Sequence, residues 1–172
     1  MIPGRHDATT ANWPQRPLHR SLLKQSCRYG DRLVSRSPNP YACRYAEGVT
    51  VLGTDGRNVQ DLCQHVLVRD KADETSLKQI SELNALSSTL KWAHICPTGP
   101  DSVPTMPHAE RDPMVIQEKY HPQVYFAGNC NKFATSKVGA TRLVCVPRFS
   151  DEGQAVLVKL PSLDVELVKF EE

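Results

Sequence analysis

Two short apolar runs in this 172-residue chain each end in a glycine-containing turn, and this repeated arrangement constrains the fold more than any other feature. The run Val49–Leu52 leads into Gly53-Thr54-Asp55-Gly56, and the run Val124–Ala127 leads into Gly128-Asn129-Cys130-Asn131. Runs of this length and β-branched character are typical of buried strands. In α/β folds, ligands gather in the turns that follow such strands.

The residues between these two strands carry helical signals. Asn58 is a candidate N-cap, with Asp61 three residues later, which predicts a short helix over about 58–66. Over 76–92, apolar residues recur at spacings of three and four, which predicts an amphipathic helix with an optional break near Asn84. The two strands are therefore expected to be connected through helices.

Several further strands are expected, mostly after the second glycine turn. They are predicted over residues 32–35, 142–146, 154–160 and 163–170. The last alternates between apolar and polar residues, so it should be half-exposed. The order strand, helix, helix, strand and then several antiparallel strands indicates one α/β (α+β) domain.

The chain also contains long irregular stretches and two tryptophans. Residues 97–113 include five prolines, and so long a segment without regular structure should be pinned against another part of the molecule. The polar residues 70–75 are expected to form a mobile insertion. Trp92, at the end of the second helix, is expected in the core, and the alternative for Trp13 and Trp92 is a role as partner-binding anchors. Tyr125, in the second apolar strand, is expected to be structural.

The net charge of +2 hides a division along the chain. Residues 1–44 contain eight Lys and Arg against two Asp, a charge of +6, whereas the remainder carries −4. A basic segment can face a polyanion or an acidic partner. A solvated, loop-rich surface is the favoured interpretation, because no helical stripe or aromatic interleaving organises these charges; direct nucleic-acid binding is the alternative.

The cysteine spacing and the N-terminal residues indicate the cellular compartment that is expected for the protein. No CxxC pair or zinc-finger spacing occurs among the six cysteines, and the first residues lack the apolar core of a signal peptide. Free thiols in a cytosolic or nuclear protein are therefore expected rather than three disulfides in a secreted one. No run of about 20 apolar residues is present, so no membrane partner is expected.

The glycine turns, together with one near the N-terminus, resemble the later motifs of calcineurin-like metallophosphoesterases. Those motifs are Gly-Asn-His-Asp/Glu, a lone His and Gly-His-x-His. The positions that correspond to them are Gly4–Asp7, Asp55 and Gly128–Asn131. The resemblance implies a partial calcineurin-like sandwich, the C-terminal half of that domain.

The resemblance also implies that the metal centre is degenerate. Four ligand positions hold other residues, which are Arg5, Asp55, Asn129 and Asn131. A guanidinium keeps its positive charge, and neutral amides are weak ligands, so no metal, cofactor or catalytic residue is expected. His6 and Asp7 survive, and the favoured interpretation is that they belong to a hydrogen-bonded turn.

A longer series of motifs resembles the small-subunit family of the eukaryotic replicative DNA polymerases alpha, delta and epsilon, and above all the small subunits of DNA polymerase delta. The motifs lie at residues 3–9, 14–19, 39–41, 52–61, 94–101, 112–113 and 121–129. Each is weak alone, and their order and spacing make the likeness specific. It covers nearly the whole chain and is weakest over 67–90.

This second resemblance implies a nuclear, non-catalytic accessory subunit. Such a subunit holds the C-terminal domain of the catalytic polymerase subunit and a smaller accessory subunit, and reaches DNA only through the complex. Family members begin with an OB-fold domain and the first half of the phosphoesterase domain. Residues 1–172 are therefore expected to be the C-terminal portion of the domain, and to be poorly stable alone, because a half-sheet exposes edges and apolar faces.

One enzymatic alternative remains open from the residues. A metal-dependent phosphoesterase or nuclease could use a rearranged site made of His6, Asp7 and Asp55, with His19 as a further member. Carboxylates and imidazoles are suitable ligands for two catalytic metal ions.

Overall fold

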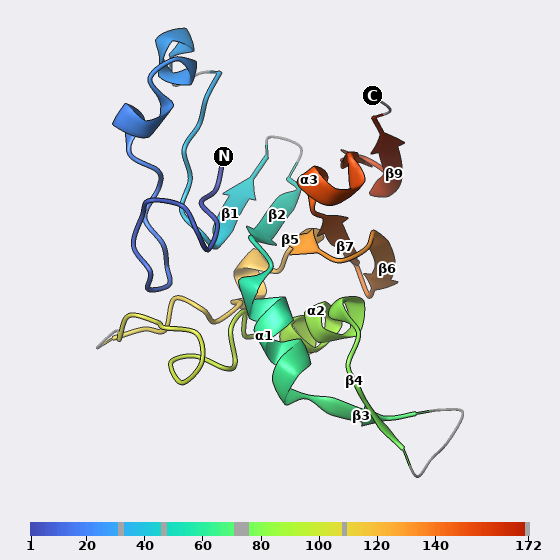
Figure 1. Ribbon diagram of the computed structural model, residues 1–172. Helices are drawn as coiled ribbons and strands as arrows, with labels where there is room; N and C mark the ends of the chain where they lie inside the picture. Colours follow the sequence, from blue (N-terminus) through green and yellow to red (C-terminus); the bar gives the residue numbers. More distant parts are fainter. Residues whose placement is uncertain (31–32, 46–47, 71–75, 108–109, 171–172) are drawn as a thin grey trace.

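The computed structural model describes residues 1–30, 33–45, 48–70, 76–107 and 110–170. Its centre is a five-stranded sheet with the strand order β1-β2-β5-β7-β6 (Figure 1). The strands of this sheet are β1 (Tyr41–Arg44), β2 (Thr50–Thr54), β5 (Val124–Cys130), β6 (Ala134–Val138) and β7 (Thr141–Pro147). The helices are α1 (Arg57–His65), α2 (Glu82–Lys91) and the short α3 (Phe149–Glu152). This mixed arrangement confirms the predicted α/β (α+β) class.

The three central strands, β2, β5 and β7, run parallel, and the outer strands β1 and β6 run antiparallel to their neighbours. The strands predicted at 49–52, 124–127 and 142–146 are confirmed. The antiparallel strands expected after the second glycine turn are present in the pair β6–β7 and in the hairpin of the last two strands, and β7 in addition pairs in parallel with β5. β6 was missed, since its sequence Ala-Thr-Ser-Lys-Val is short and only partly buried at the sheet edge.

Helices α1 and α2 cover one face of the sheet, as Figure 1 shows. Alternate residues of the strands point into this layer, where Leu52, Tyr125 and Leu143 are buried. Each large apolar side chain removed from water in this way stabilises the fold by about 1.5–3 kcal/mol. Tyr125 is thus structural, as predicted.

The other face of the sheet packs against a hairpin of β8 (Gln154–Lys159) and β9 (Asp164–Lys169), the predicted last two strands. β9 alternates between exposed and half-buried residues, as predicted. Between the hairpin and the sheet lies a small cavity of about 200 Å³. Its lining is apolar and consists of Val124, Phe126, Val144, Val146, Val156 and Val158.

Both main helices begin at other residues than the sequence suggested. The N-cap of α1 is Gly56, not Asn58, whose buried side chain instead donates to the Ile95 carbonyl at 2.7 Å. α2 begins only at Glu82, where the Ser81 hydroxyl accepts from the backbone of Asn84. The residues just before it form β4 (Leu77–Gln79), which pairs with β3 (Leu67–Arg69) in a second hairpin. The apolar spacing that suggests a longer helix therefore includes an exposed strand.

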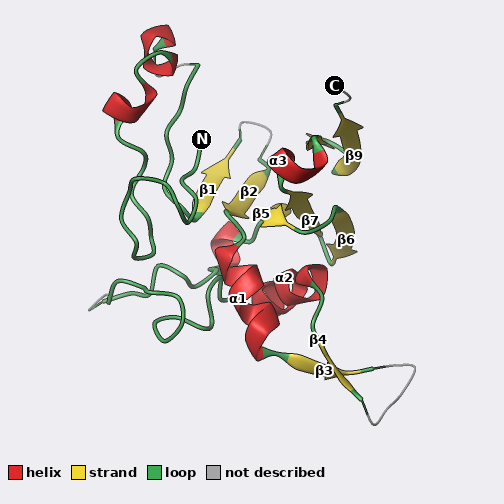
Figure 2. Ribbon diagram, viewed as in Figure 1, coloured by secondary structure: helices red, strands yellow, loops and turns green. Residues whose placement is uncertain are grey.

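Two irregular segments, the one around Trp13 and the proline-rich one at 97–107, are joined by backbone hydrogen bonds; Figure 2 shows both as loops. Trp13 is fully buried; its backbone N–H donates to the Pro104 carbonyl, and its carbonyl accepts from Met106, both at 2.8 Å. The proline-rich segment is thus pinned, as predicted. Trp92 is 53% exposed, so its expected place in the core is wrong. The reason is that α2 ends just before it, so Trp92 is the C-cap residue and not part of the buried helix face.

Two further predicted segments lie partly outside the described residues. Residues 33–35 do not form the strand predicted over 32–35, and Arg32 lies outside the described residues. Of the insertion predicted over 70–75, residues 71–75 lie outside them too.

All six cysteines are free. Within the described ranges, no helix is long and apolar enough to cross a membrane.

Candidate functional site

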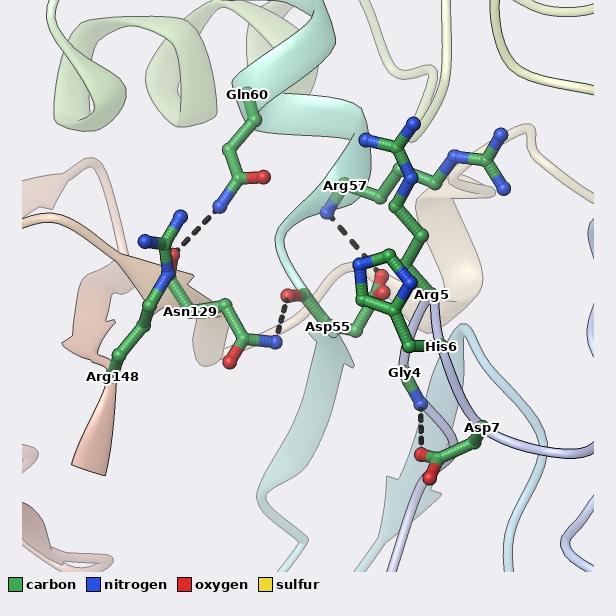
Figure 3. A pocket seen from close by; sticks show the side chains of 9 residues that line it. All are labelled: Gly4, Arg5, His6, Asp7, Asp55, Arg57, Gln60, Asn129 and Arg148. Carbon is green, nitrogen blue, oxygen red and sulfur yellow. Dashed lines mark hydrogen bonds between the residues drawn. The ribbon is translucent and has the colours of Figure 1, made fainter. Parts of the chain in front are cut away.

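The three turns singled out in the sequence converge at one end of the parallel strands (Figure 3). They surround a cavity of about 550 Å³, called here the arginine pocket. Its lining consists of Gly4, Arg5, His6, Asp7, Asp55, Arg57, Gln60, Asn129 and Arg148. The parallel direction of β2, β5 and β7 brings these groups together, because the carboxyl ends of parallel strands share one edge.

The turn after β2 is built from its own polar side chains. The backbone N–H of Gly56 donates to the Thr54 hydroxyl, which in turn donates to the Asn58 amide oxygen at 2.9 Å. The Asp55 carboxylate accepts from the backbone N–H of Arg57 at 3.3 Å, so it satisfies the first N–H of α1. The first backbone N–H of α1 therefore has a partner within the chain.

The turn after β5 touches the turn after β2. Gly56 has a φ of +88°, and a Cβ on it would overlap the carbonyl oxygen of Gly128. Asn129 has a φ of +51°, a conformation that Asn tolerates better than most residues, and its amide donates to the Asp55 carbonyl at 2.9 Å. Gln60 donates to the Asn129 carbonyl at 2.6 Å. Asn129 thus links two turns.

The N-terminal turn is closed by Asp7, whose carboxylate accepts from the backbone N–H of Gly4 at 2.7 Å. In Figure 3 this carboxylate turns back toward Gly4, away from Asp55. Arg5 and His6 are exposed, and the Arg5 side chain extends toward that of Arg57. The hydrogen-bonded turn expected around His6 and Asp7 is therefore present at Asp7.

Burial shapes the chemistry of Asp55, which is only 6% exposed. Desolvation raises the pKa of its carboxyl group, and hydrogen bonds from its surroundings together with the charge of Arg57 oppose that shift only in part. A carboxyl group in this state is less ready to be ionised than a solvated one.

Two predicted residues lie elsewhere. Asn131 lines a neighbouring hollow, where its backbone N–H donates to the Glu82 carboxylate at 3.0 Å. His19 accepts from the backbone of Ser21 and caps the 3₁₀ turn Arg20–Leu23. Within the described part of the chain, no three His, Cys, Asp or Glu side chains are grouped so that they could hold a metal ion.

Sequence reasoning missed three members of the pocket, Arg57, Gln60 and Arg148. Arg148 could have been found, since it directly follows β7, the third parallel strand. Arg57 and Gln60 lie in the first turn of α1, and the Gln60 amide donates to the Asn129 carbonyl. Their inclusion depends on where α1 starts, which the sequence placed too late.

Comparison with known proteins shows the family of the chain. The family model for the B subunits of DNA polymerases alpha and epsilon matches residues 1–135. The chain belongs to this family. Over 175 aligned residues that cover 99% of the chain, it is 39% identical to "DNA polymerase delta subunit 2" of Drosophila melanogaster and 33% identical to "DNA polymerase delta small subunit" of Oryza sativa subsp. japonica.

A Saccharomyces cerevisiae protein, "DNA polymerase delta small subunit", is 29% identical over 192 residues, which cover 99% of the chain and 39% of that protein. The alignments to the fly and rice proteins cover 37% of each. The chain thus spans little more than a third of the length of these relatives. Membership in the family confirms the resemblance seen in the sequence motifs.

Proposed function

We propose that the chain is part of a non-catalytic small subunit of DNA polymerase delta, which serves DNA replication by holding other subunits together. The observation that carries this proposal is the likeness to small subunits of that polymerase over 99% of the chain. A replicative role implies a nuclear location. The fold expected for the whole domain is the calcineurin-like sandwich, with residues 1–172 in its C-terminal portion.

The arginine pocket supports a non-catalytic role. Three guanidinium groups, those of Arg5, Arg57 and Arg148, line the place where a metal centre would assemble, and guanidinium stays protonated at any physiological pH. These fixed positive charges oppose a divalent cation. The Asn129 amide group is oriented by its hydrogen bond to the Asp55 carbonyl, and the Asp7 carboxylate by its hydrogen bond from the Gly4 backbone, so both side chains serve the turns that they close. We propose that the ancestral ligand positions are vestigial.

The expected partners are the C-terminal domain of the catalytic subunit and a smaller accessory subunit. The longest polypeptide that contains this chain should be co-expressed with the tagged C-terminal domain of the delta catalytic subunit. Retention through affinity and size-exclusion steps is expected. The corresponding domain of the DNA polymerase alpha catalytic subunit is the matched control. Failure to retain the delta domain would count against the proposal.

The enzymatic alternative has one observation in its favour, since His6, Asp7 and Asp55 line the same pocket. It predicts Mn²⁺-dependent hydrolysis of a generic phosphodiester such as bis(p-nitrophenyl) phosphate. The favoured proposal predicts no turnover above that of an Asp55→Asn variant. Metal-dependent turnover that this substitution abolishes would replace the accessory role with an enzymatic one.

Direct nucleic-acid contact is a further candidate for the basic segment. Arg20, Lys24 and Arg28 surround one hollow between two 3₁₀ turns, Arg20–Leu23 and Ser26–Tyr29. If these groups contact phosphates, the logarithm of the binding constant should fall steeply and linearly with the logarithm of the salt concentration. A flat salt response would exclude this role.

A further inference from the structure

The cations of the arginine pocket lie around one opening and come from three separate parts of the chain. Arg5 belongs to the N-terminal turn, Arg57 to the first turn of α1, and Arg148 to the residue after β7. In Figure 3 the side chains of Arg5 and Arg57 lie on one side of the pocket and that of Arg148 on the other. Like charges brought together by the fold repel one another unless an anion lies between them.

Among the described residues, the carboxylates of the pocket form no ion pair with these arginines, although the charge of Arg57 partly opposes the raised pKa of Asp55. Within the described ranges, neither Arg5 nor Arg57 forms an ion pair, and Arg148 has only a loose one, 3.7 Å from exposed Asp151. The Arg57 guanidinium donates to the Ala11 carbonyl at 3.4 Å, which leaves most of its N–H groups for a ligand. Asp7 and Asp55 are engaged by backbone N–H groups.

The shape of the pocket indicates the class of anion. Its volume of about 550 Å³ lies within the range of small-molecule sites. A single carboxylate presents two coplanar oxygens and matches one guanidinium fork. Guanidinium groups on opposite sides require an anion with oxygens in several directions, as a phosphate or diphosphate has. Gln60 and His6 add further hydrogen-bonding groups to the lining.

We propose that the arginine pocket binds a phosphate-bearing small anion, with Arg5 and Arg57 on one side of the phosphate group and Arg148 on the other. The site needs no metal ion, because the guanidinium groups provide the positive charge that metal ions provide in phosphoesterases. This proposal goes beyond the accessory role and does not depend on it.

The test is the binding of inorganic pyrophosphate to the longest polypeptide that contains the chain. Isothermal titration calorimetry should be run with EDTA, at an ionic strength held constant with chloride. Saturable binding at one site is expected. Each of the variants Arg5→Gln, Arg57→Gln and Arg148→Gln should weaken it by about tenfold or more, since each loses charge-assisted hydrogen bonds. The matched control is Arg44→Gln, an exposed arginine on β1 outside the pocket, which should bind as the unmodified protein does.

A substitution that removes a negative charge distinguishes this anion site from a metal site. Asp55→Asn removes a negative charge from the pocket and should tighten pyrophosphate binding, whereas it would weaken a metal centre. Adenosine diphosphate identifies the source of the phosphate: equal affinity means that the anion alone is recognised, and tighter binding means that a nucleotide is. Absence of saturable binding, a requirement for Mn²⁺, or equal losses in the pocket and control variants would each overturn the proposal.

Binding of the catalytic subunit's C-terminal domain is measured separately. Retention of the catalytic subunit's C-terminal domain by Arg5→Gln, together with lost pyrophosphate binding, would support the anion site and leave the accessory role intact. Intact pyrophosphate binding without subunit retention would support the site and contradict the accessory role.

Discussion

The carbonyl oxygen of Gly128 occupies the place where a Cβ on Gly56 would lie, so the turns after β2 and β5 meet without any side chain between them. Gly56 also has a φ of +88°, a conformation that disfavours all other residues. This contact holds two walls of the arginine pocket at a fixed separation. The close contact therefore links the glycine turn after the first apolar run with the glycine turn after the second.

The contact predicts a large effect of Gly56→Ala. Gly48 has a similar φ of +82°, and among the described residues no atom outside its chain neighbours lies within 4 Å of its would-be Cβ, so Gly48→Ala is the matched control. The control should cost about 1–2 kcal/mol of unfolding free energy from backbone strain alone. Gly56→Ala should cost at least about 2 kcal/mol more, because backbone must move. Urea unfolding of the longest polypeptide that contains the chain measures both, and equal costs would contradict the contact.

Asn129 should contribute to stability through two separable properties. Its amide hydrogen bond to Asp55 is worth about 1 kcal/mol, and its positive φ is a further cost for most replacements. Asn129→Gly should lose only the hydrogen bond, whereas Asn129→Ala should lose the bond and add strain. The alanine variant is therefore expected to be less stable by about 1 kcal/mol in chemical denaturation. The reverse order would show that the backbone of this turn is unstrained.

The raised pKa of Asp55 predicts a pH-dependent stability. The folded protein holds this proton more tightly than the unfolded chain, so the contribution of Asp55 is greatest below its unfolded pKa of about 3.9 and is lost as the pH rises through the folded pKa. Asp55→Asn should consequently be more stable than the unmodified protein at pH 7, with the difference shrinking toward pH 4. Thermal melts across this range test it, with the exposed Asp101→Asn as control. A constant difference at all pH values would contradict the assignment.

The two tryptophans should behave in opposite ways. Trp13 is fully buried and its backbone is bonded to the proline-rich segment, so Trp13→Ala should cost about 3–5 kcal/mol. Trp92 is half-exposed, and Trp92→Ala should change stability by less than about 1 kcal/mol. In fluorescence, the emission that remains in Trp92→Ala should be blue-shifted relative to that in Trp13→Phe. Similar costs for both alanine variants would place Trp92 in the core.

The isolated 172-residue chain is expected to be poorly stable. One face of its sheet is covered by the β8–β9 hairpin, and an apolar cavity of about 200 Å³ lies between them. Sheet faces of this kind bind hydrophobic dyes and promote association when they lack further cover. Strong anilinonaphthalene sulfonate fluorescence and a broad thermal transition are expected. A cooperative melt with little dye binding would contradict this expectation.

Much of the fold could be predicted from local patterns. The strands at 49–52, 124–127 and 142–146 are largely apolar runs, and such runs can be recognised in a sequence because parallel strands are buried on both faces. β6 and the β3–β4 hairpin were not predicted, since their strands are short and their side chains are exposed or only partly buried. The start of α2 was misplaced because apolar residues of β4 continue the helical spacing.

The sequence by itself determined which turns carry polar groups, since a glycine and an amide or carboxylate follow each buried strand at Asp55 and Asn129. It also determined the family, through motifs spread over the chain. Only the tertiary structure decided that Arg57 and Arg148 join Arg5 around one pocket, while Asn131 and His19 lie elsewhere. The physical reason is that exposed charges and loop side chains obey no local periodicity. Their positions follow from the direction of the parallel strands and from the close approach of Gly56 to Gly128.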